Sequence, residues 1–288
     1  MTGPFPPPRK RFGQNFLTDQ NVLTRIVTAA GIRSGEPVLE IGPGRGALTR
    51  LLAGAAGRVV AVEVDRDLVR HLSAEFAGDE RVEIISADVL GCDLDQLLLG
   101  RAPAPWRVVA NLPYNLSSQV LFLLLDRMPL FSGLTLMLQK EVAERIASGP
   151  DEKEYGILSV FCQLHCDVDV AFTVKPGSFH PAPKVHSAIL RLRPLPAPRF
   201  HVGDEPFFRR LVKASFGNRR KTLWNCLKGQ FAADDVQLRS TLDHCGIDPG
   251  RRGETLSLEE FARLSCALQG NPFFQALDNV PSPLAGEG

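Results

Sequence analysis

The stretch Glu40-Ile-Gly42-Pro-Gly44-Arg-Gly46 decides the fold of this 288-residue chain. Residues 37–41 form an apolar run of strand length, and residues 47–52 have the spacing of a helix. The glycines therefore lie in a strand-to-helix turn, where a ligand can approach the backbone and the free N–H groups of the helix. Many glycine-rich turns only reverse the chain, so this motif needs support from its surroundings.

Strands and helices alternate on both sides of this turn. A helix capped by Asp19 precedes it; strands are expected at 58–63, 82–87, 106–111 and 135–138, and helices at 67–76, 93–98, 118–127 and 140–147. Apolar strands separated by helices are typical of a parallel sheet covered on both faces. After a helix at 157–166, strands at 167–174 and 186–192 have no helix between them, which favours an antiparallel edge pair. We predict a Rossmann-like α/β fold with a seven-stranded, mostly parallel sheet.

The chain changes character after the proline-rich stretch Arg193-Pro-Leu-Pro-Ala-Pro. Only helices are expected from Pro206 to about Leu268, which predicts a small all-helical C-terminal domain. We assign residues 9–200 to the α/β domain and residues 201–275 to the helical one. Residues 1–8 and 276–288 are expected to be disordered.

Composition excludes several classes of protein. Hydrophobic residues make up 44% of the chain, enough for a sizeable core, but no apolar run is long enough to cross a bilayer. The N-terminus lacks the apolar core of a signal peptide, so a cytoplasmic location is expected. Cys162, His165 and Cys166 lie close together in sequence without further ligands at matched spacing, so we expect buried thiols and no metal.

Positive charge is concentrated in one part of the chain, although the net charge is only +1. Between Thr173 and Gln230 there are twelve Lys or Arg residues and two acids, and residues 209–228 contain seven basic residues and no acid. A solvated helix face normally includes acids that form i,i+4 pairs with its basic residues. The pattern therefore indicates a polyanionic partner such as a nucleic acid.

Polar side chains follow three further strands of the predicted sheet. Glu63 ends the second strand, 21 residues after Gly42, where a carboxylate accepts hydrogen bonds from ribose hydroxyls. Asp88 follows the third strand, where it can accept from an adenine amino group, and Asn111 ends the fourth. The glycines are spaced G-x-G-x-G, which differs from the dinucleotide pattern. Four consecutive strand ends with ligand-type residues fit a single bound nucleoside, so S-adenosylmethionine is favoured over NAD. The alternative for Glu63 and Asp88 is that each caps the helix that follows it.

The tetrapeptide Asn111-Leu112-Pro113-Tyr114 predicts the chemistry. The N6 amino group of adenine is a poor nucleophile because its lone pair is delocalised into the ring. The Asn111 side-chain carbonyl and the Leu112 main-chain carbonyl can accept both N6 hydrogens and favour sp³ geometry, while Pro113 stiffens the loop. Tyr114 can stack on a base that has left its helix. The alternative is an ordinary turn with Tyr114 packed.

A second aromatic residue is offered by Phe179-His-Pro-Ala-Pro-Lys184-Val185. Phe179 can stack on the other face of the base, although a lone Phe is more often part of a core. Lys184 can contact phosphate. No general base, nucleophile or metal is required, because the sulfonium is an activated leaving group and orientation carries most of the rate.

Together these segments resemble a known family. The relevant motifs are Lys10-Arg-Phe-Gly-Gln-Asn-Phe-Leu17, Glu40-Ile-Gly-Pro-Gly44, Asn111-Leu-Pro-Tyr114, Met137-Leu-Gln-Lys-Glu-Val142, Tyr155-Gly-Ile-Leu-Ser-Val160, Phe179 to Val185 and Arg219-Arg-Lys-Thr-Leu223. They occur in order from about residue 9 to 268. As a set they resemble the bacterial ribosomal RNA adenine N6,N6-dimethyltransferases, the KsgA/RsmA family.

The resemblance implies a class I methyltransferase fold and dimethylation of two adjacent adenosines in a hairpin near the 3′ end of small-subunit rRNA. It implies a monomer that acts on an assembling small subunit, with the helical domain and basic surface docked on rRNA. The implied cofactor contacts are Asn15, Leu17, Gly42, Glu63, Asp88 and Asn111, and the implied RNA contacts are Lys184, Arg219, Arg220 and Lys221.

Four alternatives remain. A sister enzyme that dimethylates large-subunit rRNA would share the cofactor and Asn-Leu-Pro-Tyr motifs. The Phe179 loop and the helical domain favour the interpretation that the substrate is small-subunit rRNA. DNA adenine methyltransferases typically have a second proline where Leu112 stands. A ribosome-assembly factor with secondary or lost catalysis is opposed by intact Glu63, Asp88 and Asn111. An NAD-dependent oxidoreductase would need an acid/base pair that we do not find.

Overall fold

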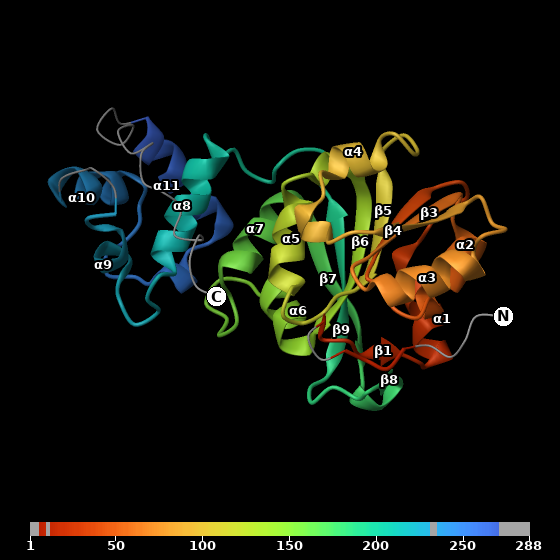
Figure 1. Ribbon diagram of the computed structural model, residues 1–288. Coiled ribbons are helices and arrows are strands. Elements are labelled where there is room, and N and C mark those ends of the chain that lie inside the picture. The colour runs from red at the N-terminus through yellow and green to blue at the C-terminus, as the bar shows by residue number, and fades with distance from the viewer. Residues whose placement is uncertain (1–5, 10–11, 231–234, 271–288) are drawn as a thin grey trace. The chain divides into compact units, whose positions relative to one another are not determined.

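The computed structural model describes residues 6–9, 12–230 and 235–270. Residues 1–5 and 276–288, which were expected to be disordered, lie outside this range. The chain divides into two compact units, Met1–Ala147 with His165–Ala197 and Ser148–Leu164 with Pro198–Gly288. Figure 1 traces the chain through both.

The first unit contains a seven-stranded sheet in the order β4-β3-β2-β5-β6-β9-β7. Its strands are β2 (Pro37–Ile41), β3 (Arg58–Glu63), β4 (Val82–Ser86), β5 (Trp106–Asn111), β6 (Phe131–Gln139), β7 (Cys166–Val174) and β9 (Ser187–Pro194). The first five strands in this order run parallel, and β9 is antiparallel to both β6 and β7. The predicted mostly parallel sheet with an antiparallel edge pair is confirmed, and its chain order reverses between β2 and β5.

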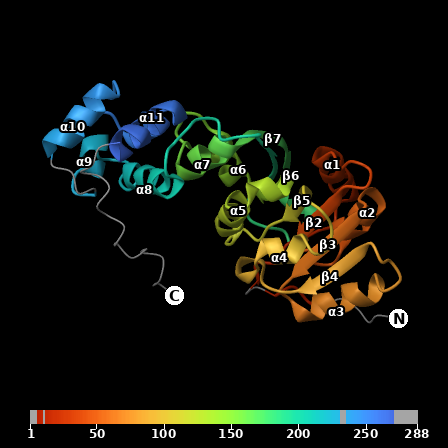
Figure 2. The same ribbon diagram turned by 90° about the horizontal axis from the view of Figure 1, so that it is seen from above.

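Among the described residues of this unit, the α-helices are α1 (Gln20–Ala30), α2 (Ala47–Ala55), α3 (Arg66–Glu75), α4 (Leu94–Leu98), α5 (Ser117–Leu125) and α6 (Lys140–Ala147). Helices α1 and α2 lie on one side of the sheet and α4 and α5 on the other (Figure 2). Strand residues such as Leu39, Val60 and Val108 are therefore fully buried. Because helices cover both faces of the sheet, the residues of its strands are apolar in continuous runs.

A second, two-stranded sheet joins distant parts of the sequence. Strand β1 (Phe16–Leu17) pairs antiparallel with β8 (Phe179–His180), so that Leu17 faces Phe179 in the register. Strand β8 follows a short 3₁₀ turn, η4 (Pro176–Ser178). Periodicity cannot reveal strands of two residues, so this pairing was not predicted from the sequence.

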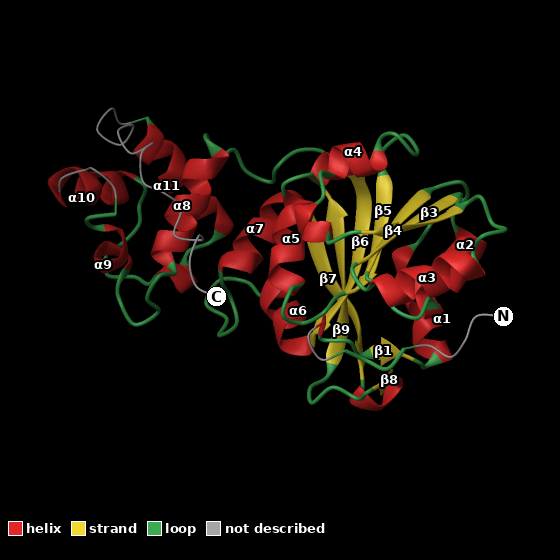
Figure 3. Ribbon diagram, viewed as in Figure 1, coloured by secondary structure: helices red, strands yellow, loops and turns green. Residues whose placement is uncertain are grey.

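The second unit is helical, with α7 (Ile157–His165), α8 (Glu205–Ser215), α9 (Leu223–Leu227), α10 (Asp235–His244) and α11 (Leu258–Gln269) (Figure 3). Tyr155 is 1% exposed, and its ring packs on Phe216, which in turn packs on Phe261, with centroid distances of 5.9 Å for both pairs. Residues 148–164 fall within the predicted first domain but pack with the C-terminal helices. The expected boundary at residue 200 leaves out this insertion.

Two negative findings concern the described residues alone. No helix among residues 6–9, 12–230 and 235–270 is long and apolar enough to cross a membrane. Over the same ranges, no three or more His, Cys, Asp or Glu side chains are grouped as metal ligands, and Cys162 and Cys166 are buried thiols.

Two neighbouring glycines provide a test of the close approach between the loop that follows α2 and the loop that precedes β2. A methyl group at Gly57 would lie 2.4 Å from the Gly35 carbonyl oxygen, whereas one at Gly54, within α2, would meet nothing within 4 Å. We expect Gly57→Ala to lower the free energy of unfolding by about 2–3 kcal/mol. The matched variant Gly54→Ala should raise it by about 0.5–1 kcal/mol, because alanine is the better helix former. Urea unfolding of both variants measures this; equal midpoints would contradict it.

Candidate active site

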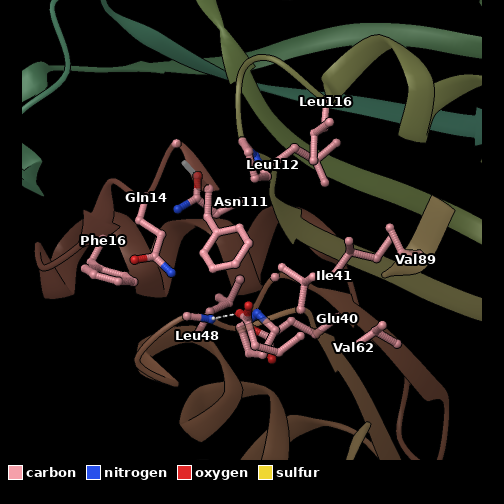
Figure 4. Close-up of a pocket in the computed structure, with 18 of the residues that line it drawn as sticks. Gln14, Phe16, Glu40, Ile41, Leu48, Val62, Val89, Asn111, Leu112 and Leu116 are labelled. Atoms are coloured by element: carbon pink, nitrogen blue, oxygen red, sulfur yellow. Dashed lines mark hydrogen bonds between the residues drawn. The ribbon is translucent and has the colours of Figure 1, made fainter. Parts of the chain in front are cut away.

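A cleft opens at the carboxyl ends of β2, β3 and β5, beside the point where the strand order reverses. Its volume is about 1090 Å³ when the open solvent at its mouth is included. Figure 4 shows Phe16 of the N-terminal segment on one side of the cleft, Asn111 and Leu112 on another, and Glu40 close to Ile41. The predicted residues Asn15, Leu17, Gly42, Glu63, Asp88, Asn111, Leu112, Pro113 and Tyr114 all line it.

The glycine-rich turn adopts a backbone that only glycine accommodates easily. Gly42, Gly44 and Gly46 have φ values of 69°, 59° and 74°. A Cβ on Gly44 would lie 3.0 Å from the Phe16 ring, and one on Gly46 would lie 2.5 Å from Leu72. Gly46 is the N-cap of α2 and provides no side-chain cap, so the first N–H groups of that helix stay available to a ligand.

Glu63 holds this turn against the neighbouring strand. The side chain is 6% exposed; its Oε2 accepts from the Gly44 amide at 3.1 Å and its Oε1 from the Asp65 amide at 2.9 Å. Burial raises the pKa of this carboxyl. A carboxylate has about four acceptor positions, so further ones remain for ribose hydroxyls. Asp65, not Glu63, is the N-cap of α3.

The Asp88 carboxylate makes a contact within the protein and also lines the cleft. It caps the short 3₁₀ turn at residues 89–91 by accepting from the Leu90 amide at 3.0 Å. The alternative that Asp88 caps the helix that follows it is therefore correct for this contact. The same side chain is exposed and lines the cleft, so the second carboxylate oxygen can face a ligand.

Asn111 is anchored by one end of its amide. Its Nδ2 donates to the Asn15 main-chain carbonyl at 3.3 Å, which turns the other end, Oδ1, away from that bond. Within the described part of the chain, neither Asn111 Oδ1 nor the Leu112 carbonyl oxygen accepts a hydrogen bond. The Leu112 amide, in contrast, donates to the Met137 carbonyl at 3.3 Å, which fixes this segment to β6. Two open acceptors thus follow each other at the end of β5.

The aromatic candidates lie in different surroundings. The Tyr114 hydroxyl is 2.7 Å from Ser187 Oγ, so the ring is held at the edge of the cleft, and burial raises its pKa. Phe179 is 5% exposed and belongs to a hydrophobic cluster that includes Leu17 and Met137. Phe179 and Lys184 do not line the cleft. The structure therefore brings Tyr114 to the cleft and keeps Phe179 in the core.

Sequence reasoning missed Glu40 as a site residue. Its carboxyl group is 1% exposed, lines the cleft, and its Oε2 has no hydrogen-bond partner in the described residues. Burial, together with the nearby Glu63 carboxylate, raises its pKa to about 8. An acid inside the apolar run Val38–Ile41 was the signal, because an unpaired buried carboxyl needs a reason to be there.

A clasp over the Asp65 side of the cleft was also missed. Arg9 pairs with Asp65 at 2.8 Å and also contacts Asp67, and Gln14 Nε2 donates to Asp65 at 3.1 Å. These contacts tie the N-terminal segment to the start of α3. The acidic partners of Arg9 are more than fifty residues away from it in the sequence, so local sequence patterns could not predict these contacts.

This donor set fits S-adenosylmethionine. Glu63 offers carboxylate acceptors for a ribose, Asp88 offers one for an adenine amino group, and the glycine turn admits a ligand to the backbone. The unpaired oxygen of Glu40 adds a further hydrogen-bonding group to the lining of the cleft. The residues that would hold the cofactor are therefore present together.

The basic candidates of the helical unit differ in their contacts. Arg219 donates from Nη1 to the Lys153 carbonyl at 3.1 Å and from Nη2 to the Tyr155 carbonyl at 3.2 Å. Arg220 and Lys221 follow it in the same exposed turn. Arg219 therefore has a structural role in its own unit, while Arg220 and Lys221 present their charges to solvent.

Comparisons with known proteins found a matching family and several similar proteins. The family model described as ribosomal RNA adenine dimethylase matches residues 7–269. Ribosomal RNA small subunit methyltransferase A of Geobacter sulfurreducens is 58% identical over 261 residues, covering 90% of this chain and 95% of the relative. The protein of the same name from Streptococcus pneumoniae strain P1031 is 45% identical over 267 residues, covering 91% and 92%.

Two solved structures are similar over most of the chain. The crystal structure of a dimethyladenosine transferase from Plasmodium falciparum has a TM-score of 0.73 and 26% identity, and covers 88% of this chain and 98% of its own. The 23S rRNA methyltransferase ErmE has a TM-score of 0.68 and 28% identity, covering 88% and 100%.

Glu40 predicts an unusual pH dependence of stability. Folded, the carboxyl keeps its proton up to about pH 8, whereas the unfolded chain loses it near 4.5. The unfolded state then binds fewer protons, so the free energy of unfolding falls as the pH rises through this window. Relative to Glu40→Gln, the wild type should lose about 2–3 kcal/mol between about pH 5.5 and pH 8.

Urea unfolding at both pH values measures this difference. Contributions from other groups, Glu63 included, are present in both proteins. Glu80→Gln, which changes an exposed glutamate, serves as the control and should follow the wild type. Parallel pH profiles of wild type and Glu40→Gln would show that the buried carboxyl is already ionised in the folded protein.

Proposed function

Since this chain belongs to the ribosomal RNA adenine dimethylase family, we propose that it dimethylates the N6 amino group of adenine in small-subunit ribosomal RNA, with S-adenosylmethionine as methyl donor. One observation carries the proposal. Asn111 Oδ1 and the Leu112 carbonyl are adjacent open acceptors at the edge of the cofactor cleft. An amino group with two hydrogens can donate one hydrogen bond to each of these acceptors.

The two acceptors explain how a weak nucleophile is activated. Holding both N6 hydrogens turns the nitrogen lone pair away from the ring and towards the methyl donor. S-adenosylmethionine supplies the methyl group on a sulfonium, which is already an activated leaving group. Pro113, which lacks an N–H and has a fixed φ, stiffens the segment that aims the acceptors. Orientation and complementary charge therefore account for most of the catalysis.

Tyr114 and Phe179 differ in how readily they could contact a target base. The Tyr114 ring, fixed by its bond to Ser187, is the stacking surface for a target base that has been turned out of its helix. Phe179 is the proposed second surface, but in this structure Leu17 faces it across the β1–β8 pair. Contact between Phe179 and the base would require this pair to move.

The small subunit is favoured over the large one by sequence. Relatives that are named small-subunit methyltransferases are 45–58% identical to this chain, whereas the 23S rRNA methyltransferase ErmE is 28% identical. We propose two adjacent adenosines near the 3′ end of the RNA as the target, in an assembling small subunit. We also propose a monomer that works in the cytoplasm and docks through its basic residues.

The substrate and the chemistry can be tested together. Labelled S-adenosylmethionine is incubated with small subunits that lack the dimethyladenosines, with large subunits and DNA in parallel. We expect label only in small-subunit rRNA, as N6,N6-dimethyladenosine. Asn111→Ala should slow transfer about 100-fold or more at saturating cofactor, because one acceptor of the reacting amino group is lost. Asn21→Ala, an exposed residue on α1, is the control.

The outcomes separate the alternatives. Label in large-subunit rRNA would assign the chain to the sister enzyme, and label in DNA would assign it to the DNA methyltransferases. If no substrate is labelled, a binding role in ribosome assembly becomes the leading hypothesis. Full activity of Asn111→Ala would remove the acceptor pair from the mechanism.

The basic turn of the helical unit gives a second test. Arg220→Ala and Lys221→Ala should each weaken binding to precursor small subunits and lower the salt slope of the affinity by about one, without changing stability. Arg219→Ala should instead lower the melting temperature, because two carbonyls at residues 153 and 155 lose their donor. Filter binding against salt, with thermal melts, distinguishes these effects. A loss of stability in all three variants would contradict the division of roles.

A further inference from the structure

The short sheet formed by β1 and β8 links two segments with different roles. Residues 12–17, which contain β1, line the cofactor cleft, and β8 begins the loop that runs from Phe179 to Lys184. The Thr18 amide continues the pairing by donating to the Ser178 carbonyl at 2.9 Å. Figure 1 shows β1 and β8 side by side below the main sheet, although about 160 residues separate them.

A single carboxylate connects this sheet to helix α1. Asp19 Oδ1 accepts from the Asn21 and Val22 amides at 3.0 and 3.3 Å and so caps α1. Asp19 Oδ2 accepts from Ser178 Oγ at 3.0 Å, and this bond lowers the pKa of the carboxyl. Ser178 immediately precedes Phe179. The carboxylate therefore fixes the start of α1 and the start of β8 at the same time.

The hydrogen bond between Asp19 and Ser178 lies outside the apolar contacts that hold β1 and β8 together. Leu17 and Phe179 are buried in the same hydrophobic cluster, so apolar burial alone would hold the two strands near each other. Asp19 and Ser178 lie at the border of that cluster and are half-buried. Loss of a hydrogen bond at such a place costs little global stability, but it removes one of the bonds that hold the backbone next to Phe179, others being those from Thr18 to the Ser178 carbonyl.

We propose that Asp19 and Ser178 are positioning residues that couple the binding of the cofactor to the binding of the RNA. Contacts with the cofactor fix residues 12–17, and the β1–β8 pair passes this order to residues 178–184. A segment ordered by one ligand costs the second ligand less conformational entropy, so each ligand strengthens the binding of the other by the same factor. The RNA half of this inference rests on the proposed function.

Two substitutions break the contact while keeping the helix cap. Ser178→Ala removes the hydroxyl donor and leaves the Asp19 cap intact. Asp19→Ser keeps a capping oxygen, because serine is a favoured N-cap residue, but offers no second oxygen to Ser178. The double variant tests whether both act through one contact. Thr28→Ala, which deletes an exposed hydroxyl on the same helix, is the matched control.

Two readouts are measured with and without S-adenosylhomocysteine. The first is amide hydrogen exchange of peptides that span residues 175–185, which needs no RNA. The second is the affinity for small-subunit precursors. In the wild type and in Thr28→Ala, S-adenosylhomocysteine should slow exchange and tighten RNA binding about fivefold or more. In either single variant the gain should fall below about twofold, with no further loss in the double variant.

The inference is overturned if S-adenosylhomocysteine leaves exchange at residues 175–185 unchanged in the wild type, or if the single variants keep the full gain. Its failure is distinguishable from that of the proposed function. A chain that methylates small-subunit rRNA but lacks coupling would refute only the inference. A chain that methylates no rRNA but shows exchange protection that depends on Ser178 would refute the function and keep the link inside the protein.

Discussion

The hydrogen bond from the Gly44 amide to the Glu63 carboxylate is the contact on which the site depends. It joins the turn after β2 to the end of β3, and it is possible only because parallel strands bring their carboxyl ends to one edge of the sheet. The left-handed glycines allow the turn to reach Glu63 without a clash. The neighbouring residue Asp65 then receives Arg9 and Gln14, so the same corner also fixes the segment that covers the cleft.

The site contains several polar atoms without a hydrogen-bond partner in the described residues. Leaving a buried acceptor unpaired costs about 1–3 kcal/mol, and folded proteins normally avoid this. Glu40 Oε2 lacks a partner, as do Asn111 Oδ1 and the Leu112 carbonyl, when the described residues are considered. Their neighbours are well paired: Tyr114 binds Ser187, and the Leu112 amide binds Met137. At the cleft, the proposed ligands would supply the missing partners of these atoms.

The sequence predicts the sheet and the cofactor cleft well because both follow from local patterns. Each strand end carries its functional residue directly after an apolar run, and parallel topology then brings Gly42, Glu63 and Asn111 together. Features that depend on distant contacts were not predictable in the same way. The β1–β8 pair, the burial of Phe179 behind Leu17 and the grouping of residues 148–164 with later helices all arise from partners far away in the chain. Glu40 is different, because an acid inside an apolar strand is visible in the sequence, but its place in the cleft lining is not.

The helical unit has one consequence for how such a chain can evolve. Its first helix, α7, precedes two strands of the sheet in the sequence, and the rest of the unit follows them. A recombination event near residue 198 would therefore deliver the later helices without Tyr155 and Phe161, which pack on Phe216 and Phe208. Exchange of the later helices as a terminal cassette would therefore lose these packing contacts. Because the two units interleave along the sequence, an exchange that keeps these contacts must include residues 148–164 together with the later helices.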